Sequence, residues 1–501
     1  MLTKCVSPEI DKSNFTEFDF MIRQFCQTSF ILWNLLASSL LIADTNTESV
    51  LPDLGSFSVN KQQEDQLGQY FLRELRANTA ILSDPLTHDY LENLCYRLAF
   101  AAQSKQTNLD IVVLPDRNIN AFAVAGGIIG INAGLLLYAD NEAEVAAVLA
   151  HELAHLDLHH YTRSQQAQAG DQWLYLGALL ASIALAANSS NNDAGLAVGL
   201  TAQAALVDKQ LSYSRLHERE ADHVGIQTLT NAGFNPQAMA SFFSKMDRQA
   251  RQVGLMPSFL LTHPSSQERN ADSTLRSQQY PNKGNVDSLD YQLIRRRLLA
   301  IIDGRQPENL AVLQQRLNNN PQHEPTLLSI LFTYLQNEQF DQARQIAKQL
   351  HILSPQRLDY IIAQADIELA DQQAKTALKL LEEALLLTPQ SQALKMYAAK
   401  AAIKAQDYNK AITWLNNLSY ERANDPEVWQ ALMECYQAQK DGLQLLRARA
   451  EFAFLLGSYD KALADLEQAK KLAVNNYPLL AKIKQRQLFI EQTKEVSKKI
   501  E

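Results

Sequence analysis

Cysteine is scarce in this 501-residue chain, and its four copies are widely separated. They are Cys5, Cys26, Cys95 and Cys435, and no two of them form a CxxC pair. A cysteine-built zinc site is therefore not expected, because such sites use closely spaced thiolates. So few thiols also cannot form the disulfide framework of a small secreted scaffold. The sequence leaves open whether Cys95 pairs with Cys435.

Basic residues are not in excess either. The chain has 46 Lys and Arg against 55 Asp and Glu, which gives a formal net charge of −9. Proteins that bind nucleic acid carry a basic stripe or patch, so we expect no nucleic-acid partner. The apolar and charged contents of 46% and 20% are ordinary for a globular protein. A chain of this length is expected to form two or three domains.

Apolar runs long enough to cross a bilayer as a helix, about 20 residues, are also missing. The run at 30–42 (FILWNLLASSLLI) has 13 residues, lies after Arg23 and ends just before Ala43. This arrangement is typical of an export signal with its cleavage site. We therefore expect residues 1–43 to be a signal region, with Met21 as an alternative start because the preceding stretch mixes acids and lysines. A buried N-terminal helix is the alternative.

A second apolar region covers residues 173–207. Its first piece, 173–187, has 15 residues and is followed by the polar stretch NSSNND at 188–193. Both pieces are too short to span a membrane. We expect a helical hairpin that packs on the protein or makes a peripheral contact with a membrane surface.

Local patterns predict a mixed α+β fold for the first half of the chain. Residues 63–80 are expected to be helical, and the β-branched run at 108–116 is expected to be a strand. The glycine pair at 126–127 predicts a turn with a strand on either side. Asn141 is expected to start a helix that continues through HELAHLDLHH, with Glu144 completing a capping box.

The last 200 residues contain an internal repeat. Residues Phe340, Ala374 and Tyr408 follow one another at steps of 34, as do Ala343, Ala377 and Ala411, and Pro355 and Pro389 differ by the same step. This is the tetratricopeptide period, so we predict an all-α superhelix with a concave groove for a peptide or partner protein. The stretch 457–469 resembles one more repeat helix outside this register. A plain helical bundle is the alternative.

Four of the ten histidines lie within the segment LAHELAHLDLHHYTR, at 151–160. On a helix, His151 and His155 place their imidazoles on one face, one turn apart, where both can bind one zinc ion. Glu152 between them can act as a general base, which is the chemistry of HExxH. His159 and His160 are expected on the next turn, as polar surface more than as functional groups. A polar helix face is the alternative for the whole motif.

A third metal ligand must come from elsewhere. The HxxGxxH continuation is excluded, because Leu158 and Tyr161 occupy its Gly and His positions. The segment SRLHEREADHVG offers Glu218 as a ligand, and Asp222 one turn on can accept from the far nitrogen of His151.

The neighbours of this glutamate are expected to play no part at the metal. Glu220 is offset by two residues from Glu218, so its side chain should point elsewhere. His217 and His223 lie off the same ligand face. An exposed acidic helix is the alternative for this segment.

The segment LLTHPSSQER places His263 before a proline, in a predicted loop, with Arg269 six residues later. A loop imidazole and a guanidinium could stabilise the oxyanion of a tetrahedral intermediate. At rest, His263 could instead occupy the open coordination position of the zinc, with the hairpin at 173–207 as a further cover. A structural histidine is the alternative.

The blocks NAFAVAGG, HELAH, SRLHEREAD and THPSSQER together resemble the zinc metallopeptidase family that includes the CAAX prenyl proteases and the heat-shock membrane protease HtpX, over residues 58–275. The resemblance implies a gluzincin-type α+β domain and one Zn²⁺ per chain. It also implies an edge strand near 121–131 on which the substrate lies antiparallel. The roles that it carries over are: ligands His151, His155 and Glu218, base Glu152, and loop residues His263 and Arg269.

With the repeat tail and the export signal, the resemblance narrows to the periplasmic branch of this family that acts in outer-membrane β-barrel assembly. It implies an exported endopeptidase for misfolded or stalled outer-membrane proteins, whose repeat groove docks on the β-barrel assembly machinery. A zinc-stabilised chaperone or adaptor without proteolysis is the alternative, and a membrane-embedded relative is disfavoured by the short apolar segments. The expected parts are a signal region at 1–43, a peptidase domain at 44–280, a linker at 281–304 and a repeat domain at 305–501.

Overall fold

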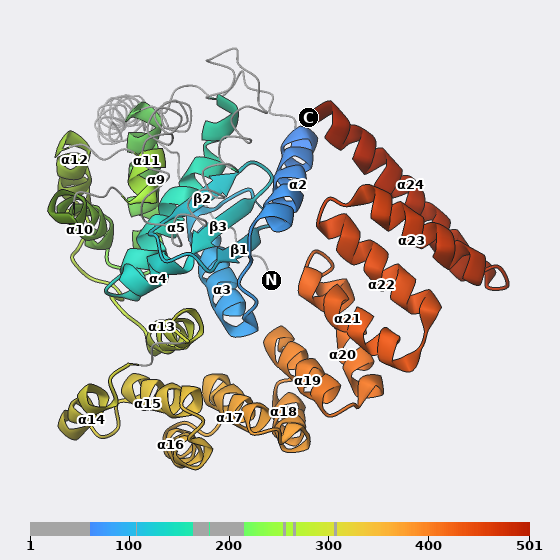
Figure 1. Ribbon diagram of the computed structural model, residues 1–501. Coiled ribbons are helices and arrows are strands. Elements are labelled where there is room, and N and C mark those ends of the chain that lie inside the picture. Colours follow the sequence, from blue (N-terminus) through green and yellow to red (C-terminus); the bar gives the residue numbers. More distant parts are fainter. Residues whose placement is uncertain are drawn as a thin grey trace, which may run out of the picture. The chain divides into compact units, whose positions relative to one another are not determined.

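The computed structural model describes residues 61–106, 108–163, 180, 215–253, 257–263, 267–304 and 308–500 (Figure 1). The predicted signal region and, apart from residue 180, the predicted apolar hairpin lie outside these residues. Among the described helices, none has a stretch both long and apolar enough to span a bilayer.

The first half of the chain contains a three-stranded sheet, as the local patterns predict. Its strands are β1 (Asp110–Leu114), β2 (Ala121–Val124) and β3 (Ile128–Asn132), in the order β1-β3-β2. β3 runs parallel to β1 and antiparallel to β2. The sheet edge predicted at 121–131 is therefore limited to β2. β3 is paired on both sides, so among the described strands of this stretch only β2 lies at an edge.

The turn between β2 and β3 explains the glycine pair. Gly126 and Gly127 have φ of 85° and 81°, a region that residues with a Cβ rarely adopt. A Cβ on Gly127 would also lie 2.2 Å from the carbonyl oxygen of Asn108. The turn therefore requires glycine for both its conformation and its space.

Helix α5 (Glu142–Asp157) lies at the centre of this half of the protein. Residues 142–156 are all buried, and the helix packs against β2 and against the helices α3 (Pro85–Ala102), α9 (Arg215–Asn231) and α10 (Gln237–Val253) (Figure 1). The alanine-rich sequence allows this, because small side chains let neighbouring elements approach on every side. Among the described residues, this half also contains the helices α2 (Lys61–Asn78), α4 (Ala133–Tyr138), α11 (Ser258–Thr262) and α12 (Gln267–Ser277).

Both ends of α5 differ from the prediction in detail. Asn141 caps the helix by accepting from the amide of Glu144 at 3.1 Å, but the Glu144 carboxylate accepts from the amide of Asp140 rather than from Asn141. The capping box is therefore only half formed, since the Glu144 carboxylate also pairs with Lys245 Nζ at 2.8 Å. At the other end the helix stops at Asp157, so the expectation of one continuous helix through His160 is wrong.

The second half of the predicted linker at 281–304 forms helix α13 (Leu289–Ile302). Ser288 caps this helix, and the fully buried Tyr291 donates its hydroxyl to the carbonyls of Leu136 and Ala139 at 2.8 Å each. The apolar face of α13 is buried in the core. This burial stabilises a helix in the segment that follows the Pro, Gly and Asn turn.

The second half of the chain is a tetratricopeptide array, as predicted. Helices α16, α18, α20 and α22 start at Phe340, Ala374, Tyr408 and Gly442, each 34 residues after the one before. The alanines at 343, 377 and 411 are fully buried, which suits the close approach of helices in such pairs. Its helices are α14 (Leu310–Asn319), α15 (Glu324–Gln336), α16 (Phe340–Leu353), α17 (Leu358–Ala370), α18 (Ala374–Leu387), α19 (Gln392–Lys404), α20 (Tyr408–Glu421), α21 (Pro426–Gln439), α22 (Gly442–Leu455), α23 (Tyr459–Leu472) and α24 (Tyr477–Ile500).

A buried arginine connects α13 with α3 and with the repeat helices. Arg297 donates to Asp84 at 2.9 Å, to Asp366 at 2.9 Å and to the hydroxyl of Tyr397 at 2.8 Å. Burial of such charges is tolerated because each one has an opposite partner. The contact holds the N-terminus of α3, the helix that packs on α5, against α17 and α19.

The two cysteines in the described residues are not bonded to each other. Cys95 lies in α3 and Cys435 in α21, and both are buried. Burial raises the pKa of the Cys95 thiol to about 12 and that of Cys435 to about 11. Both thiols are therefore protonated at neutral pH and act as small apolar groups of the core.

Candidate metal centre

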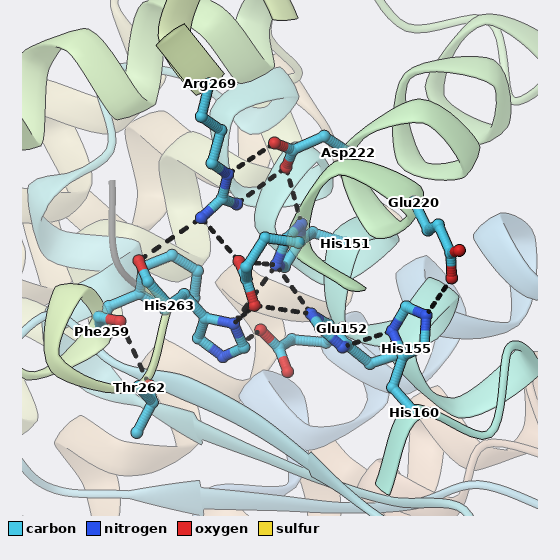
Figure 2. Close-up of polar contacts among 11 residues, drawn as sticks. His151, Glu152, His155, His160, Glu220, Asp222, Phe259, Thr262, His263 and Arg269 are labelled. Atoms are coloured by element: carbon cyan, nitrogen blue, oxygen red, sulfur yellow. Dashed lines mark hydrogen bonds and ion pairs between the residues drawn. The ribbon is translucent and has the colours of Figure 1, made fainter. Parts of the chain in front are cut away.

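The seven predicted site residues meet in one buried cluster. Figure 2 labels all of them except Glu218. α5 contributes His151, Glu152 and His155, α9 contributes Glu218 and Asp222, His263 follows α11, and α12 contributes Arg269. None of the seven is more than 4% exposed. Segments up to 112 residues apart in sequence are thus brought within hydrogen-bonding distance.

The three predicted ligands present their donor atoms to one point. The Nε2 atoms of His151 and His155 are 3.0 Å apart, and the Glu218 carboxylate lies 3.4 Å from the first and 3.5 Å from the second. A tetrahedral zinc ion with bonds of about 2.0–2.1 Å separates its ligand atoms by about 3.3 Å. The donor set and its spacing therefore fit one such ion.

His263 lies against the same group of donor atoms. Its Nδ1 lies 3.1 Å from a Glu218 oxygen and 3.4 Å from His151 Nε2, and its Nε2 lies 3.3 Å from a Glu152 oxygen. The side chain is 1% exposed and stacks on the ring of Phe259, with centroids 4.6 Å apart. One donor atom each from His151, His155, Glu218 and His263 all lie within 4.8 Å of one another.

Asp222 and Arg269 support this cluster from behind. Asp222 lies 2.9 Å from the Nδ1 of His151, the nitrogen that points away from the other ligands. Arg269 donates to both oxygens of Asp222, at 2.6 and 2.8 Å, and its Nη1 lies 2.6 Å from Glu218. The sequence predicts that Arg269 stabilises the oxyanion of an intermediate. In the structure its guanidinium contacts these two carboxylates.

Burial and charge set the protonation of the cluster in the absence of metal. Burial opposes the charged form of His151, but Asp222 and Glu218 outweigh it and raise the pKa to about 9. Burial lowers the pKa of His155 well below its usual range. For Glu218, burial acts to raise the pKa, but Arg269 and the histidines hold it well below the usual range. Burial raises the pKa of Glu152.

Two residues expected to lie away from the site are in contact with it. His160 is fully buried and its Nδ1 lies 2.9 Å from Nδ1 of His155, while its Nε2 lies 3.0 Å from Glu220. Helical spacing could not reveal these contacts, because they depend on the break after Asp157. The acidic motif that predicts Glu218 as a ligand gives no indication that Glu220 contacts His160.

The other histidines near the motif behave more as expected. His159 is 35% exposed and pairs with Glu64 at 3.3 Å. His223 is exposed and contacts Arg276. His217 stacks on His160, with ring centroids 4.4 Å apart.

Two imidazoles one turn apart on a buried helix, a carboxylate from a second helix and a further glutamate beside them define a metallopeptidase site. The chain belongs to peptidase family M48, whose sequence profile matches residues 85–274. A tetratricopeptide repeat profile matches residues 368–435.

Curated relatives extend this match over most of the chain. A protein of Vibrio cholerae is 33% identical over 90% of this chain and 94% of its own length. Proteins named β-barrel assembly-enhancing protease from Escherichia coli (strain K12) and Yersinia pestis are 31% and 30% identical. They cover 85% and 88% of this chain, and 88% and 92% of their own lengths. The similarity thus includes both the peptidase half and the repeats.

Proposed function

We propose that this chain is an exported zinc endopeptidase that hydrolyses misfolded or stalled outer-membrane β-barrel proteins in the periplasm. The observation that carries the proposal is the convergence of His151, His155 and Glu218 on one point with Glu152 beside them. The names of the relatives, which cover nearly the whole chain, supply the substrate class.

In this proposal His151, His155 and Glu218 hold one zinc ion. When bound, zinc polarises the scissile carbonyl and lowers the pKa of a water molecule to about 7. Glu152 accepts a proton from the attacking water and passes it to the leaving amine. The upward pKa shift that burial gives Glu152 suits this role, because it brings the carboxylate closer to neutral pH.

Asp222 and Arg269 have positioning roles. Asp222 accepts from Nδ1–H of His151 and so keeps its Nε2 unprotonated for the metal. Arg269 holds Asp222 in place through paired N–H donors and forms an ion pair with Glu218. This assignment replaces the oxyanion role suggested by the sequence for the arginine, since its guanidinium is engaged with carboxylates.

The substrate is proposed to bind along the edge strand β2. This strand packs on α5, the helix that carries Glu152. An extended peptide paired antiparallel with β2 would pass beside the ligand cluster. Unfolded β-barrel precursors are suited to this mode, because their unpaired strands are free to join a sheet edge.

The repeat helices are proposed to dock the enzyme on the β-barrel assembly machinery. Tetratricopeptide arrays bind peptides and partner proteins through their concave face. A peripheral membrane contact through residues 173–207 is part of the same proposal and, apart from residue 180, falls outside the described residues. Docking would bring stalled precursors to the peptidase site.

The function is tested with the purified full chain and an unfolded outer-membrane β-barrel protein. We expect cleavage that requires about one zinc per chain, is lost on chelation with o-phenanthroline, and returns with added zinc. A folded β-barrel serves as the matched control and should stay intact. Stoichiometric zinc with no cleavage under any condition would instead support the chaperone or adaptor function.

Zinc binding is expected to release about one proton per chain at pH 7. With a pKa of about 9 in the metal-free protein, His151 is protonated at pH 7 and must become neutral to bind metal, whereas His155 is neutral already and Glu218 is ionised. The apparent zinc affinity should rise about tenfold per pH unit from 7 toward 9.

Titration calorimetry in two buffers of different ionisation enthalpy measures this release directly. The release should disappear above about pH 10, where His151 is neutral before zinc arrives. A zinc affinity that is independent of pH between 7 and 9 would contradict the assignment.

A further inference from the structure

A break in the chain directly after the ligand helix turns His160 back toward His155. Helix α5 ends at Asp157, and His159 has φ of 50°, in the left-handed region. In an unbroken helix a residue five positions later lies about 140° around the axis. The break therefore permits a contact that helical spacing would not give, with the two Nδ1 atoms 2.9 Å apart.

The far side of His160 is occupied as well (Figure 2). Its Nε2 lies 3.0 Å from an oxygen of Glu220, and the same oxygen accepts from Arg163 at 2.8 Å. His160 is fully buried, and its ring is stacked on His217 at an interplanar angle of 14°. The imidazole is thus fixed by two hydrogen-bonding contacts and by a parallel ring.

The direction of each hydrogen bond follows from the ligand role of His155. This residue presents Nε2 to the other donor atoms, so in its neutral form the proton is on Nδ1 and is donated to His160. Nδ1 of His160 must then accept, and its Nε2–H donates to the Glu220 carboxylate. Every contact along the path has one donor and one acceptor.

The arrangement repeats what is seen behind the other ligand histidine. Nδ1 of His151 contacts the carboxylate of Asp222, which in turn accepts a hydrogen bond from Arg269. His155 is likewise connected to a carboxylate paired with an arginine, Glu220 with Arg163, but the imidazole of His160 lies between them. Partners of this kind fix the tautomer and ring orientation of a metal ligand, and their removal typically costs about 10–100-fold in metal affinity.

We propose that His160 and Glu220 are positioning residues that hold the ligand His155. The proposal rests on the proposed function in one respect, because it requires zinc at the cluster. It adds an interaction to the site that neither the HExxH motif nor the glutamate motif contains. The pairing partner of Glu220, Arg163, completes the support.

The test measures the zinc affinity of the full chain by competition with a fluorescent chelator. His160→Leu keeps the volume but removes the acceptor, so we expect zinc affinity to fall about 10–100-fold. His160→Asn retains an oxygen near the Nδ1 position and should recover most of this loss. Glu220→Ala should weaken zinc binding in the same direction. The matched control is His159→Asn, an adjacent histidine outside the cluster whose positive φ asparagine tolerates.

The outcomes separate this inference from the proposed function. Wild-type zinc binding and cleavage test the function, whereas the variants test the support of His155. Equal zinc affinity in His160→Leu, Glu220→Ala and His159→Asn would overturn the inference, as would an asparagine variant no better than leucine. If His160→Leu does not fold, as judged by circular dichroism, the comparison of Glu220→Ala and His160→Asn with the control decides.

Discussion

Replacing Glu152 by Gln is expected to lower peptidase activity by about 100- to 10,000-fold and to leave zinc bound. The substitution keeps the shape of the side chain and removes only its ability to accept a proton. Glu152 is fully buried and lies beside the cluster, where its oxygen is 3.3 Å from His263 Nε2. Its role as a base, and not as a ligand, predicts this separation of activity from metal content.

The measurement combines zinc content by mass spectrometry with cleavage of an unfolded β-barrel substrate. Glu218→Gln is the matched control, because it makes the same change in a residue that we assign as a ligand. It should lose zinc and activity together, since an amide is a poor replacement for a carboxylate ligand. A Glu152→Gln variant without zinc, or a Glu218→Gln variant with full zinc, would show that the two roles are reversed.

Replacing His263 by Ala is expected to raise the basal cleavage of an unfolded substrate. The imidazole lies 3.1 Å from Glu218 and 3.4 Å from His151, near enough that it would act as a fourth ligand to an ion held by the cluster. Catalysis requires that this position be open. If His263 occupies it in about nine of ten resting molecules, its removal should increase the rate about tenfold, in proportion to the competent fraction.

The opposite role of His263 predicts the opposite result. If the imidazole mainly stabilises the oxyanion, His263→Ala should lower the rate about 100-fold or more. The initial rate of cleavage therefore distinguishes the two roles by its sign. His223→Ala is the matched control, because His223 is exposed and contacts Arg276 outside the cluster.

The repeat architecture and the metal motif could both be predicted from the sequence because each depends on local spacing. A step of 34 residues fixes where successive repeat helices start, and the structure places those starts at Phe340, Ala374 and Tyr408. An interval of four residues places His151 and His155 on one helix face. Such patterns need no knowledge of which segments meet in space.

The end of the ligand helix could not be predicted in the same way. The alanine-rich sequence favours helix through His160, yet the chain adopts a left-handed conformation at His159. The pairing of His159 with Glu64 and the burial of His160 are tertiary interactions that outweigh local helix propensity. This break decides that His160 contacts the site.

The direction of the long polar side chains likewise depended on the tertiary structure. The sequence located Arg269 near the site but not its partners, because a guanidinium can reach several groups and pairs with whichever carboxylates are buried beside it. Asp222 and Glu218 are those carboxylates here. Residues 289–302 form helix α13 for a related reason: their apolar face is buried against other segments of the core, which the local sequence does not reveal.

By itself, therefore, the sequence determined the HExxH motif on one helix face, the glutamate motif that supplies the predicted third ligand, and the period of the repeats. Only the tertiary structure decided which strand forms the edge beside Glu152, where α5 stops, and which carboxylates Arg269 and His160 contact. The physical reason is the range of the forces involved. Helical periodicity acts between neighbours in the chain, whereas burial, charge pairing and hydrogen bonding act between whatever segments the fold brings together.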